Sequence, residues 1–230
     1  MRLRSLWSVG AAVVLIGVTA TLAAAHDLFL KPDAFFVAPN ASVRVTVLSG
    51  TFSSSEGSVA ADRLLDLAVV GPGGRTAGDT GSWNAAGKAS TWAVRVGEPG
   101  TWVLGASLRP RLITLAGADF NAYLTEDGVP DMLALRKMRG ELARAATERY
   151  AKHVKALVQV GDVRTASFGT VLGYPAEVVP LDNPYEPGVK RMRVRILVDG
   201  KPVARQVVIA GGRTTSGGRI ATQTVRADAQ

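Results

Sequence analysis

The chain has 230 residues, of which 47% are apolar and 20% are charged. It is therefore long enough to bury one large core or two small ones, and this composition is that of a globular protein rather than of a disordered one. The formal net charge is +8, but no run of five or more Lys or Arg occurs, so the charge is too diffuse to predict nucleic-acid binding. Cysteine is absent, which excludes disulfides and thiol chemistry.

The first 25 residues have the pattern of a secretory signal peptide. Arg2 and Arg4 form a short positive region, residues 11–18 are apolar, and residues 23–25 (AAA) fit the small-residue pattern of a cleavage site. The alternative is an uncleaved anchor, because residues 6–25 carry no charge and about 20 residues can span a bilayer. We favour cleavage, which predicts a periplasmic mature protein with no integral membrane segment.

Most of the mature chain has the two-residue period of β-strands. Apolar residues recur at every second position along 43–47, 92–96 and 102–106, and residues 64–70 form a further strand candidate that ends at a Gly-Pro-Gly-Gly turn. A turn signal at 97–100 predicts that the strands on either side of it pair as a hairpin of a β-sandwich.

One segment departs from this period. Residues 131–150 are rich in Leu, Ala, Met, Arg and Glu, which predicts a short helical connection that is split at Gly140. The two-residue period then returns at 154–160, where Val154, Ala156 and the following alternate residues share one face. His153 belongs to the opposite face of this predicted strand.

A loosely patterned stretch follows and marks a domain boundary. We therefore expect a signal peptide at 1–25, a β-sandwich domain at 26–165 and an immunoglobulin-like domain at 166–230. The predicted fold class is all-β: a β-sandwich followed by an immunoglobulin-like or transthyretin-like β module, with one short helical connection.

Within the second domain the strongest local signal is the tight turn Asp199-Gly200. Residues 192–198 alternate before this turn and residues 203–209 return after it, so we expect these two strands to pair with each other. Residues 220–225 are predicted to form another strand close to the end of the chain.

Several pieces of the chain, taken in order, resemble a bacterial periplasmic family of undefined function, whose members are often described as nickel-uptake-type substrate-binding regions. The resemblance runs through most of the mature chain and rests on the order of the pieces rather than on any one of them. The pieces are residues 26–32 (HDLFLKP), 120–124 (FNAYL), 127–128 (DG), 148–155 (ERYAKHVK), 160–161 (VG), 172–181 (LGYPAEVVPL), 183–184 (NP) and 199–202 (DGKP).

The resemblance implies the two β modules named above and a role as the periplasmic component of a nickel or cobalt transporter. In that family the chain continues into further strands, so the second domain of this chain is expected to be truncated at its C-terminus.

His26 is the principal metal-ligand candidate. Cleavage after Ala25 would make it the N-terminal residue, where the α-amine and the imidazole can chelate one ion. Cleavage after Ala23 would place His26 third from the free amine, where amine, amide and imidazole nitrogens can surround Cu(II) or Ni(II) in a square plane. The alternative is that His26 only opens and anchors the first strand.

His153 is the only other histidine in the chain. It can contribute to a metal site only if it lies close to His26, because a site requires several donors that converge on one ion. The alternative is a structural histidine on a strand.

The remaining motifs favour structural roles. The stretch 119–131 contains several Asp, Asn and Glu residues but lacks the EF-hand spacing, so it predicts a turn-rich connection rather than a calcium site. The glycine-rich stretches at 71–74 and 211–218 lack the features of a phosphate-binding loop. No nucleophile elbow is present, and the lack of cysteine with only two histidines argues against an enzyme.

The sequence therefore predicts a non-enzymatic periplasmic protein that binds Ni(II), Co(II) or Cu(II) through His26 and His153 and works with a membrane transporter component. The alternative comes from a different class, a structural or adhesion-like interaction module without a small ligand.

Overall fold

The structure is a computed structural model that describes residues 27–214 and 216–228. The predicted signal peptide and His26 lie outside the described residues. In the described part strands predominate, and α1 (Gly117–Glu126) and α2 (Pro130–Met138) are both short, which confirms the predicted all-β sandwich fold. Neither of these two helices is long and apolar enough to cross a membrane.

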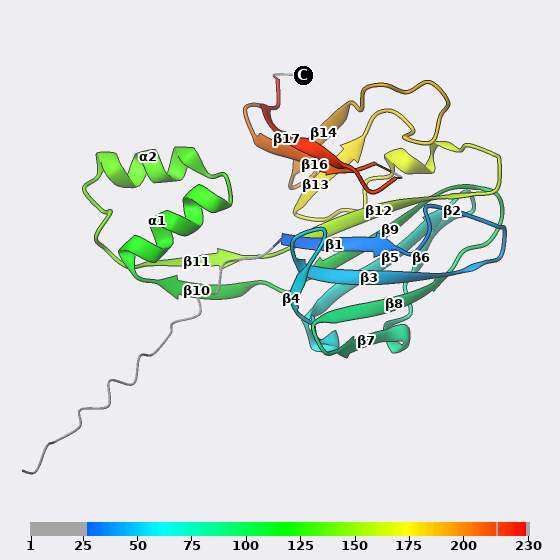
Figure 1. Cartoon of the computed structure of the whole chain (residues 1–230), viewed down its shortest axis with the longest axis horizontal. Helices are drawn as coiled ribbons and strands as arrows, with labels where there is room; N and C mark the ends of the chain where they lie inside the picture. The colour runs from blue at the N-terminus through cyan, green and yellow to red at the C-terminus, as the bar shows by residue number, and fades with distance from the viewer. Residues whose placement is uncertain (1–26, 215, 229–230) are drawn as a thin grey trace, which may run out of the picture.

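Two five-stranded sheets form the sandwich (Figure 1). The first sheet has the order β1-β3-β8-β7, with β4 paired to β3, and the second has the order β2-β12-β9-β5-β6. The strands of the first sheet are β1 (Asp27–Pro32), β3 (Ser42–Gly50), β4 (Ser55–Gly57), β7 (Trp83–Ala86) and β8 (Ala89–Arg95). Those of the second are β2 (Phe36–Val37), β5 (Leu64–Gly71), β6 (Gly74–Ala77), β9 (Gly100–Leu108) and β12 (His153–Val160).

The main core lies between these sheets and explains the two-residue period. Val45 and Val47 of β3, Trp92 of β8, and Val158 and Val160 of β12 all have no solvent exposure. Alternate residues of a strand point to opposite faces, so the apolar set of each strand faces the other sheet. Burying each such aliphatic side chain contributes about 1.5–3 kcal/mol to the hydrophobic stabilisation of the fold.

The predicted hairpin of 92–96 with 102–106 is wrong. β8 lies in the first sheet beside β3, whereas β9 lies in the second sheet between β5 and β12, so the turn at 97–100 crosses from one sheet to the other. The buried apolar side chains of both strands pack in the core between the two sheets. Alternation reveals which face of a strand is buried, but it does not reveal the partner strand.

A projecting arm leaves one side of the sandwich between β9 and β12 (Figure 1). It consists of β10 (Arg111–Leu115), α1, α2 and β11 (Ala146–Tyr150), and β10 pairs with β11 to form its stalk. The helical segment begins earlier than predicted, because α1 occupies residues 117–126, where the sequence predicts turns. It also ends earlier, because residues 146–150 form strand β11, where the sequence predicts helix.

The helical form of α1 follows from the spacing of its apolar residues. Phe120, Tyr123 and Leu124 recur at helical intervals and form a small buried cluster of the arm. The guanidinium of Arg136 in α2 lies 4.9 Å from the centroid of the Phe120 ring and donates to the backbone carbonyls of residues 141 and 144, at 2.8 and 2.7 Å. These hydrogen bonds hold residues 141–144 in a turn after α2, so the helix does not continue through this segment as predicted.

The outer face of the second sheet is covered by residues 172–174. Leu172 and Tyr174 are buried against Ala68, Val70 and Val103, which form a second apolar cluster. The approach is so close that a Cβ at Gly105 of β9 would lie 2.3 Å from Leu172 Cδ1. Because both of its faces are covered, β9 is an almost continuous buried run.

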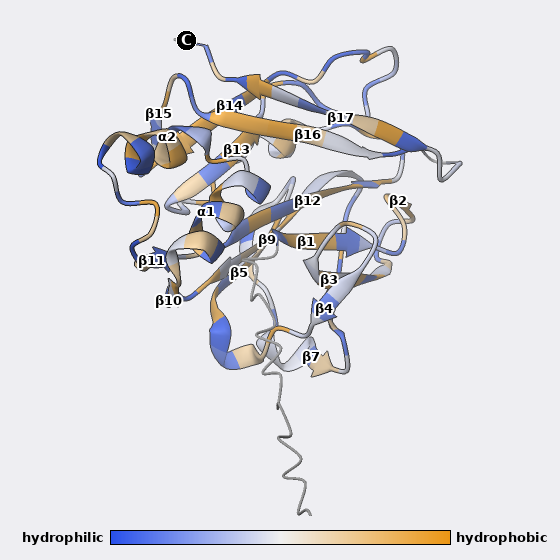
Figure 2. Cartoon of the chain, turned by 60° about the vertical axis from the view of Figure 1, so that its left-hand side comes forward, coloured by the Kyte–Doolittle hydropathy of each residue, from blue (hydrophilic) through white to orange (hydrophobic). Residues whose placement is uncertain are grey.

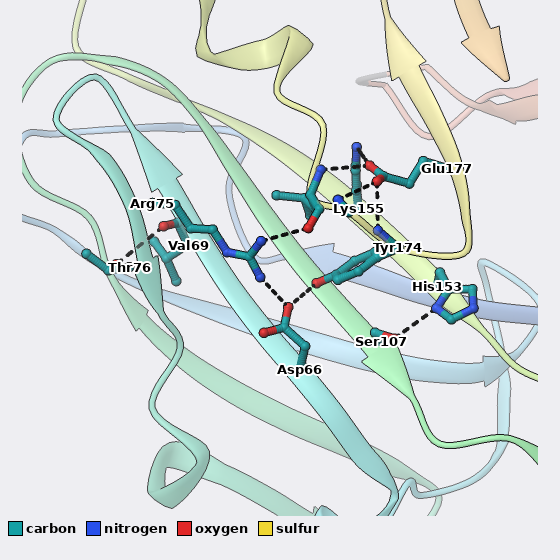
Figure 3. A network of polar contacts seen from close by, with 11 residues as sticks. Asp66, Val69, Arg75, Thr76, Ser107, His153, Lys155, Tyr174 and Glu177 are labelled. Atoms are coloured by element: carbon teal, nitrogen blue, oxygen red, sulfur yellow. Dashed lines mark hydrogen bonds and ion pairs between the residues drawn. The ribbon is translucent and has the colours of Figure 1, made fainter. Parts of the chain in front are cut away.

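Glu177 anchors this covering segment through a buried polar network (Figure 3). Its side chain is 1% exposed, and it forms an ion pair with Lys155 of β12. It also accepts hydrogen bonds from three consecutive backbone N–H groups, those of residues 172, 173 and 174, at 2.9, 2.7 and 2.8 Å. The tyrosine hydroxyl of this segment donates to Asp66 of β5 at 2.8 Å.

The remaining strands form two small sheets beyond the second sheet of the sandwich. β13 (Ala176–Pro180), β14 (Val194–Val198) and β15 (Lys201–Pro202) form one, and β16 (Val207–Arg213) pairs with β17 (Arg219–Arg226) to form the other. Apolar residues occupy the first half of β16 (Figure 2), and Ile209 in this half is 51% exposed.

The predicted turn at Asp199-Gly200 is present, but its partner strand is shorter than expected. Only Lys201 and Pro202 pair with β14, and residues 207–213 pair with β17 instead. Pro202 has no N–H to continue a ladder, and Arg205 adopts a positive φ of 62°, so the chain turns away from β14.

Candidate functional site

A polar pocket of about 360 Å³ lies where the stalk of the arm meets the edge of the sandwich. Three regions of the chain form most of it: the start of β1, the C-terminal end of α1, and the run from β11 into β12. We call it the joint pocket. It is lined by Asp27, Leu28, Tyr123, Asp127, Glu148, Tyr150, Ala151, Lys152, His153, Val154 and Ala176.

Three carboxylates line the joint pocket. Asp27 comes from β1, Asp127 from the residue that ends α1, and Glu148 from β11. Burial raises the pKa of Asp127 to about 6, and the negative charge of Asp27 adds to this shift. Glu148 Oε2 is a buried oxygen that has no hydrogen-bond partner within residues 27–214 and 216–228. This concentration of acidic groups favours a cationic ligand.

Basic and aromatic groups complete the wall of the pocket. The ammonium of Lys152 lies 5.8 Å from the centroid of the Tyr150 ring. Burial lowers the pKa of Lys152, while the nearby carboxylates of Asp27 and Asp127 act in the opposite direction. Burial also raises the pKa of the Tyr123 hydroxyl, and the charge of Glu148 reinforces this effect. Tyr123 therefore stays protonated and can act as a hydrogen-bond donor.

His153 lines the joint pocket and opens β12. Burial lowers its pKa, so the imidazole is neutral at pH 7 and is able to act as a metal ligand. Nδ1 of His153 lies 2.9 Å from Ser107 Oγ, which fixes the orientation of the ring (Figure 3). Ser107 is only 1% exposed, so this pair cannot present a serine nucleophile to a substrate.

The structure thus places His153 in the lining of the same pocket as Asp27, the residue that directly follows His26 in the sequence. His26 itself lies outside the described residues. In residues 27–214 and 216–228, no group of three or more His, Asp or Glu side chains is close enough together to hold a metal ion. The described side chains therefore form a polar, acidic pocket rather than a complete set of ligands.

A family model described as a domain of unknown function, DUF4198, matches residues 23–230. The chain belongs to the DUF4198 family. No curated protein matches this DUF4198 chain. One similar solved structure is that of dimeric latent PorU from Porphyromonas gingivalis, which is 12% identical and has a TM-score of 0.25. The alignment covers 88% of the DUF4198 chain and 15% of that PorU chain, so this chain spans a small part of it.

The sequence pieces that carry the resemblance stated above converge on the joint pocket of this DUF4198 protein. All eleven lining residues belong to one of those pieces, although the pieces are spread from residue 27 to residue 176. Residue-by-residue reasoning missed Asp127 and Glu148, because it assigned the acidic stretch to turns and the second half of 131–150 to helix. The resembling sequence pieces include both residues, and this shared membership is the signal that could have identified Asp127 and Glu148.

Proposed function

We propose that this protein is exported, loses residues 1–25, and binds a divalent transition-metal ion, Ni(II), Co(II) or Cu(II), at the joint pocket as the periplasmic partner of a membrane transporter component. The observation that carries the proposal is the convergence of the resembling sequence pieces on a pocket with three carboxylates and a neutral histidine. Carboxylate, imidazole and amine donors suit these ions.

The mature N-terminus would supply the donors that the described side chains lack. His26 is joined directly to Asp27, which lines the pocket, so its imidazole and the α-amine created by cleavage would be supplied next to Asp27. The carboxylate of Asp127 and the imidazole of His153 would add donors from the arm and from β12. Metal binding releases protons from such groups, so affinity should fall below about pH 6.

Metal titration of the exported protein tests this proposal. Protein recovered after cleavage should bind Ni(II) or Cu(II), and protein that still carries residues 1–25 should not. Asp127→Asn and His153→Ala should each weaken binding about tenfold or more. Asp119→Asn is the matched control, because Asp119 lies on the same helix as the pocket residue Tyr123 but does not line the pocket. If cleaved and uncleaved protein bind the metal equally well, or if neither binds it, the proposed metal site is wrong.

The second candidate is an interaction module, and exposed apolar residues on the C-terminal strands favour it. Val198 of β14 is 39% exposed, and Ile220 and Val225 of β17 are 46% and 50% exposed. A metal-free protein that forms a stable complex through these strands would favour this candidate over the metal-binding proposal.

A further inference from the structure

We infer that the C-terminal strands dock the protein on a membrane surface that contains anionic phospholipid. The inference goes beyond the proposed function and does not depend on a metal ion. It is argued from the distribution of charge along the chain, from the exposed apolar side chains that lie among these charges, and from an apolar pocket beside them. We call residues 187–227 the basic module.

The basic module carries the whole net charge of the protein. Of the 27 Lys and Arg and the 19 Asp and Glu in the chain, nine basic residues and one acidic residue, Asp199, lie in this module. The module therefore has a formal charge of +8, and the remaining residues, with 18 of each sign, are neutral. All nine basic residues are exposed: Lys190, Arg191, Arg193, Arg195, Lys201, Arg205, Arg213, Arg219 and Arg226. Such an asymmetry of charge indicates an anionic partner.

Folding brings these charges together on one side of the molecule. The strands β14, β16 and β17 lie side by side beyond the second sheet of the sandwich in both views (Figures 1 and 2). Arg213 of β16 lies directly opposite Arg219 of β17 in the register of the hairpin. Like charges in opposite positions destabilise a strand pair, so the stability of the fold does not explain this arrangement. An anionic surface explains it, because the phosphates would neutralise the repulsion.

Exposed apolar side chains lie on the same strands as the basic residues. Val194 of β14 is 36% exposed, Ile209 of β16 is 51% exposed, and Val225 of β17 is 50% exposed. A soluble acidic partner matches the charges alone. A membrane surface matches both features, since Lys and Arg side chains reach lipid phosphates while neighbouring apolar side chains contact the acyl region beneath them.

An apolar pocket of about 300 Å³ lies between the β16–β17 hairpin and the arm. It is lined by Leu124, Thr125, Gly128, Pro130, Leu133, Val207, Thr224 and Arg226. Arg226 belongs to both this pocket and the basic module, so an apolar surface is available directly beside a positive charge. A phospholipid has the complementary combination, an acyl chain next to an anionic head group.

The test is vesicle co-sedimentation with protein that begins at His26. This protein retains all the described residues but lacks the apolar residues 11–18, which would bind lipid by themselves. Vesicles of phosphatidylcholine with about one third phosphatidylglycerol should bind the protein at least tenfold more tightly than vesicles of phosphatidylcholine alone. Salt at about 0.5 M should remove most of this preference, and EDTA should have no effect.

Two triple variants with the same change in net charge locate the binding surface. Lys190→Gln/Arg191→Gln/Lys201→Gln, in the basic module, should weaken binding to the anionic vesicles about tenfold or more. The matched control is Arg44→Gln/Lys88→Gln/Arg95→Gln, which removes three exposed charges on the first sheet of the sandwich and should bind like the wild type. Circular dichroism checks folding, and a triple variant that fails to fold is replaced by its three single variants, each expected to weaken binding a few-fold.

An apolar substitution separates a membrane from an acidic protein as the partner. Ile220→Ser should weaken binding to the anionic vesicles a few-fold, because it removes an exposed apolar side chain of β17 from contact with lipid. Val163→Ser is the control, since Val163 is 54% exposed but lies outside the basic module. Soluble polyglutamate serves as the purely ionic probe, and it should bind more weakly than the vesicles and be insensitive to Ile220→Ser.

Three results would overturn the inference. The first is equal binding, or no binding, to neutral and anionic vesicles. The second is an equal loss in the two triple variants, because the attraction would then belong to the net charge rather than to the basic module. The third is tight binding of polyglutamate with no effect of Ile220→Ser on either probe, which would assign the basic module to an acidic protein partner.

Discussion

The strands of the sandwich and the C-terminal strands β16 and β17 both contain apolar residues, but the burial of these residues is opposite. In β3 and β12, alternate residues such as Val45 and Val158 have no exposure, whereas every residue of β17 is exposed. The difference is the presence of an opposing layer. The two large sheets bury each other's apolar faces, while β16 and β17 form a two-stranded sheet of their own. Apolar strand residues contribute to stability only where a second layer covers them.

The first prediction compares one apolar residue from each region. Trp92→Ala should lower the free energy of unfolding by about 3–5 kcal/mol, because it removes a fully buried side chain from a packed core. Ile220→Ala should change it by no more than about 0.5 kcal/mol, since this side chain is already 46% exposed. Urea unfolding followed by circular dichroism measures both. A large loss from Ile220→Ala would show that β17 is covered by a second layer in solution.

The second prediction concerns the anchor between the two regions. Glu177→Ala should cost about 3 kcal/mol in urea unfolding, because it leaves the nearly buried Lys155 ammonium and three backbone N–H groups without their acceptor. Glu177→Gln keeps an acceptor oxygen and should cost less. An unchanged unfolding midpoint in Glu177→Ala would mean that residues 172–177 are held by the apolar cluster alone.

The same carboxylate gives a stability change in acid. Burial raises the pKa of Glu177, but hydrogen bonds from Lys155 and from backbone N–H groups outweigh it, and the folded pKa lies below the ordinary value of 4.5. A depressed carboxylate pKa contributes stability above pH 4.5 that is lost as the pH falls through the folded pKa. Wild-type protein should lose this contribution in that window, and Glu177→Gln should not.

The third prediction concerns the joint pocket, where the carboxylate pKa is raised and stability changes with pH in the opposite direction. The folded pKa of Asp127 is about 6 and its ordinary value is 3.8, so the folded state binds this proton more tightly than the unfolded state. Stability should therefore fall as the pH rises from about 4 to about 6. With allowance for solvent screening, Asp127→Asn should stabilise the metal-free protein by about 1 kcal/mol at pH 7 and by little at pH 4. Thermal unfolding at the two pH values checks this, and equal effects at both would contradict it.

Strand positions could be predicted from the sequence, but strand partners could not. The segments around Val45, Val69 and Val158 are strands as expected, because their side-chain pattern depends only on which face is buried. The separation of β8 and β9 into different sheets depends on long-range packing that no local pattern encodes. Phe120, Tyr123 and Leu124 have a helical spacing that was hidden among turn-forming residues.

The candidate site was only partly predictable for a similar reason. His153 was identified by residue type, and the structure places it in the pocket. Asp127 and Glu148 are ordinary acidic residues in the sequence, and they share a pocket only in the folded arm, where Asp127 ends α1 and Glu148 lies in β11. The role of His26 as a metal ligand remains a prediction, because this residue lies outside the described residues.

The fourth prediction has the smallest effect and tests how the exposed β16–β17 hairpin is held. Arg226 of β17 forms a two-pronged ion pair with Asp131 of α2, with both N–O distances at 2.9 Å, and this links the hairpin to the arm. The pair is exposed, so Asp131→Asn should leave global unfolding unchanged. It should increase amide hydrogen exchange in β17 a few-fold, because the exposed strand loses one of its tertiary contacts.

A second exposed pair in the C-terminal region provides the matched control. Arg193 and Asp182 also form a two-pronged pair, at 2.6 and 3.0 Å, but both lie outside the β16–β17 hairpin. Asp182→Asn should therefore leave exchange in β17 unchanged. In wild-type protein, salt at about 1 M shortens the screening length to about 3 Å and should reproduce part of the Asp131→Asn effect. If exchange in β17 responds to neither Asp131→Asn nor salt, the hairpin is held by apolar contact between Ile209 and the arm at Gly128, where a Cβ would lie 2.8 Å from Ile209 Cδ1.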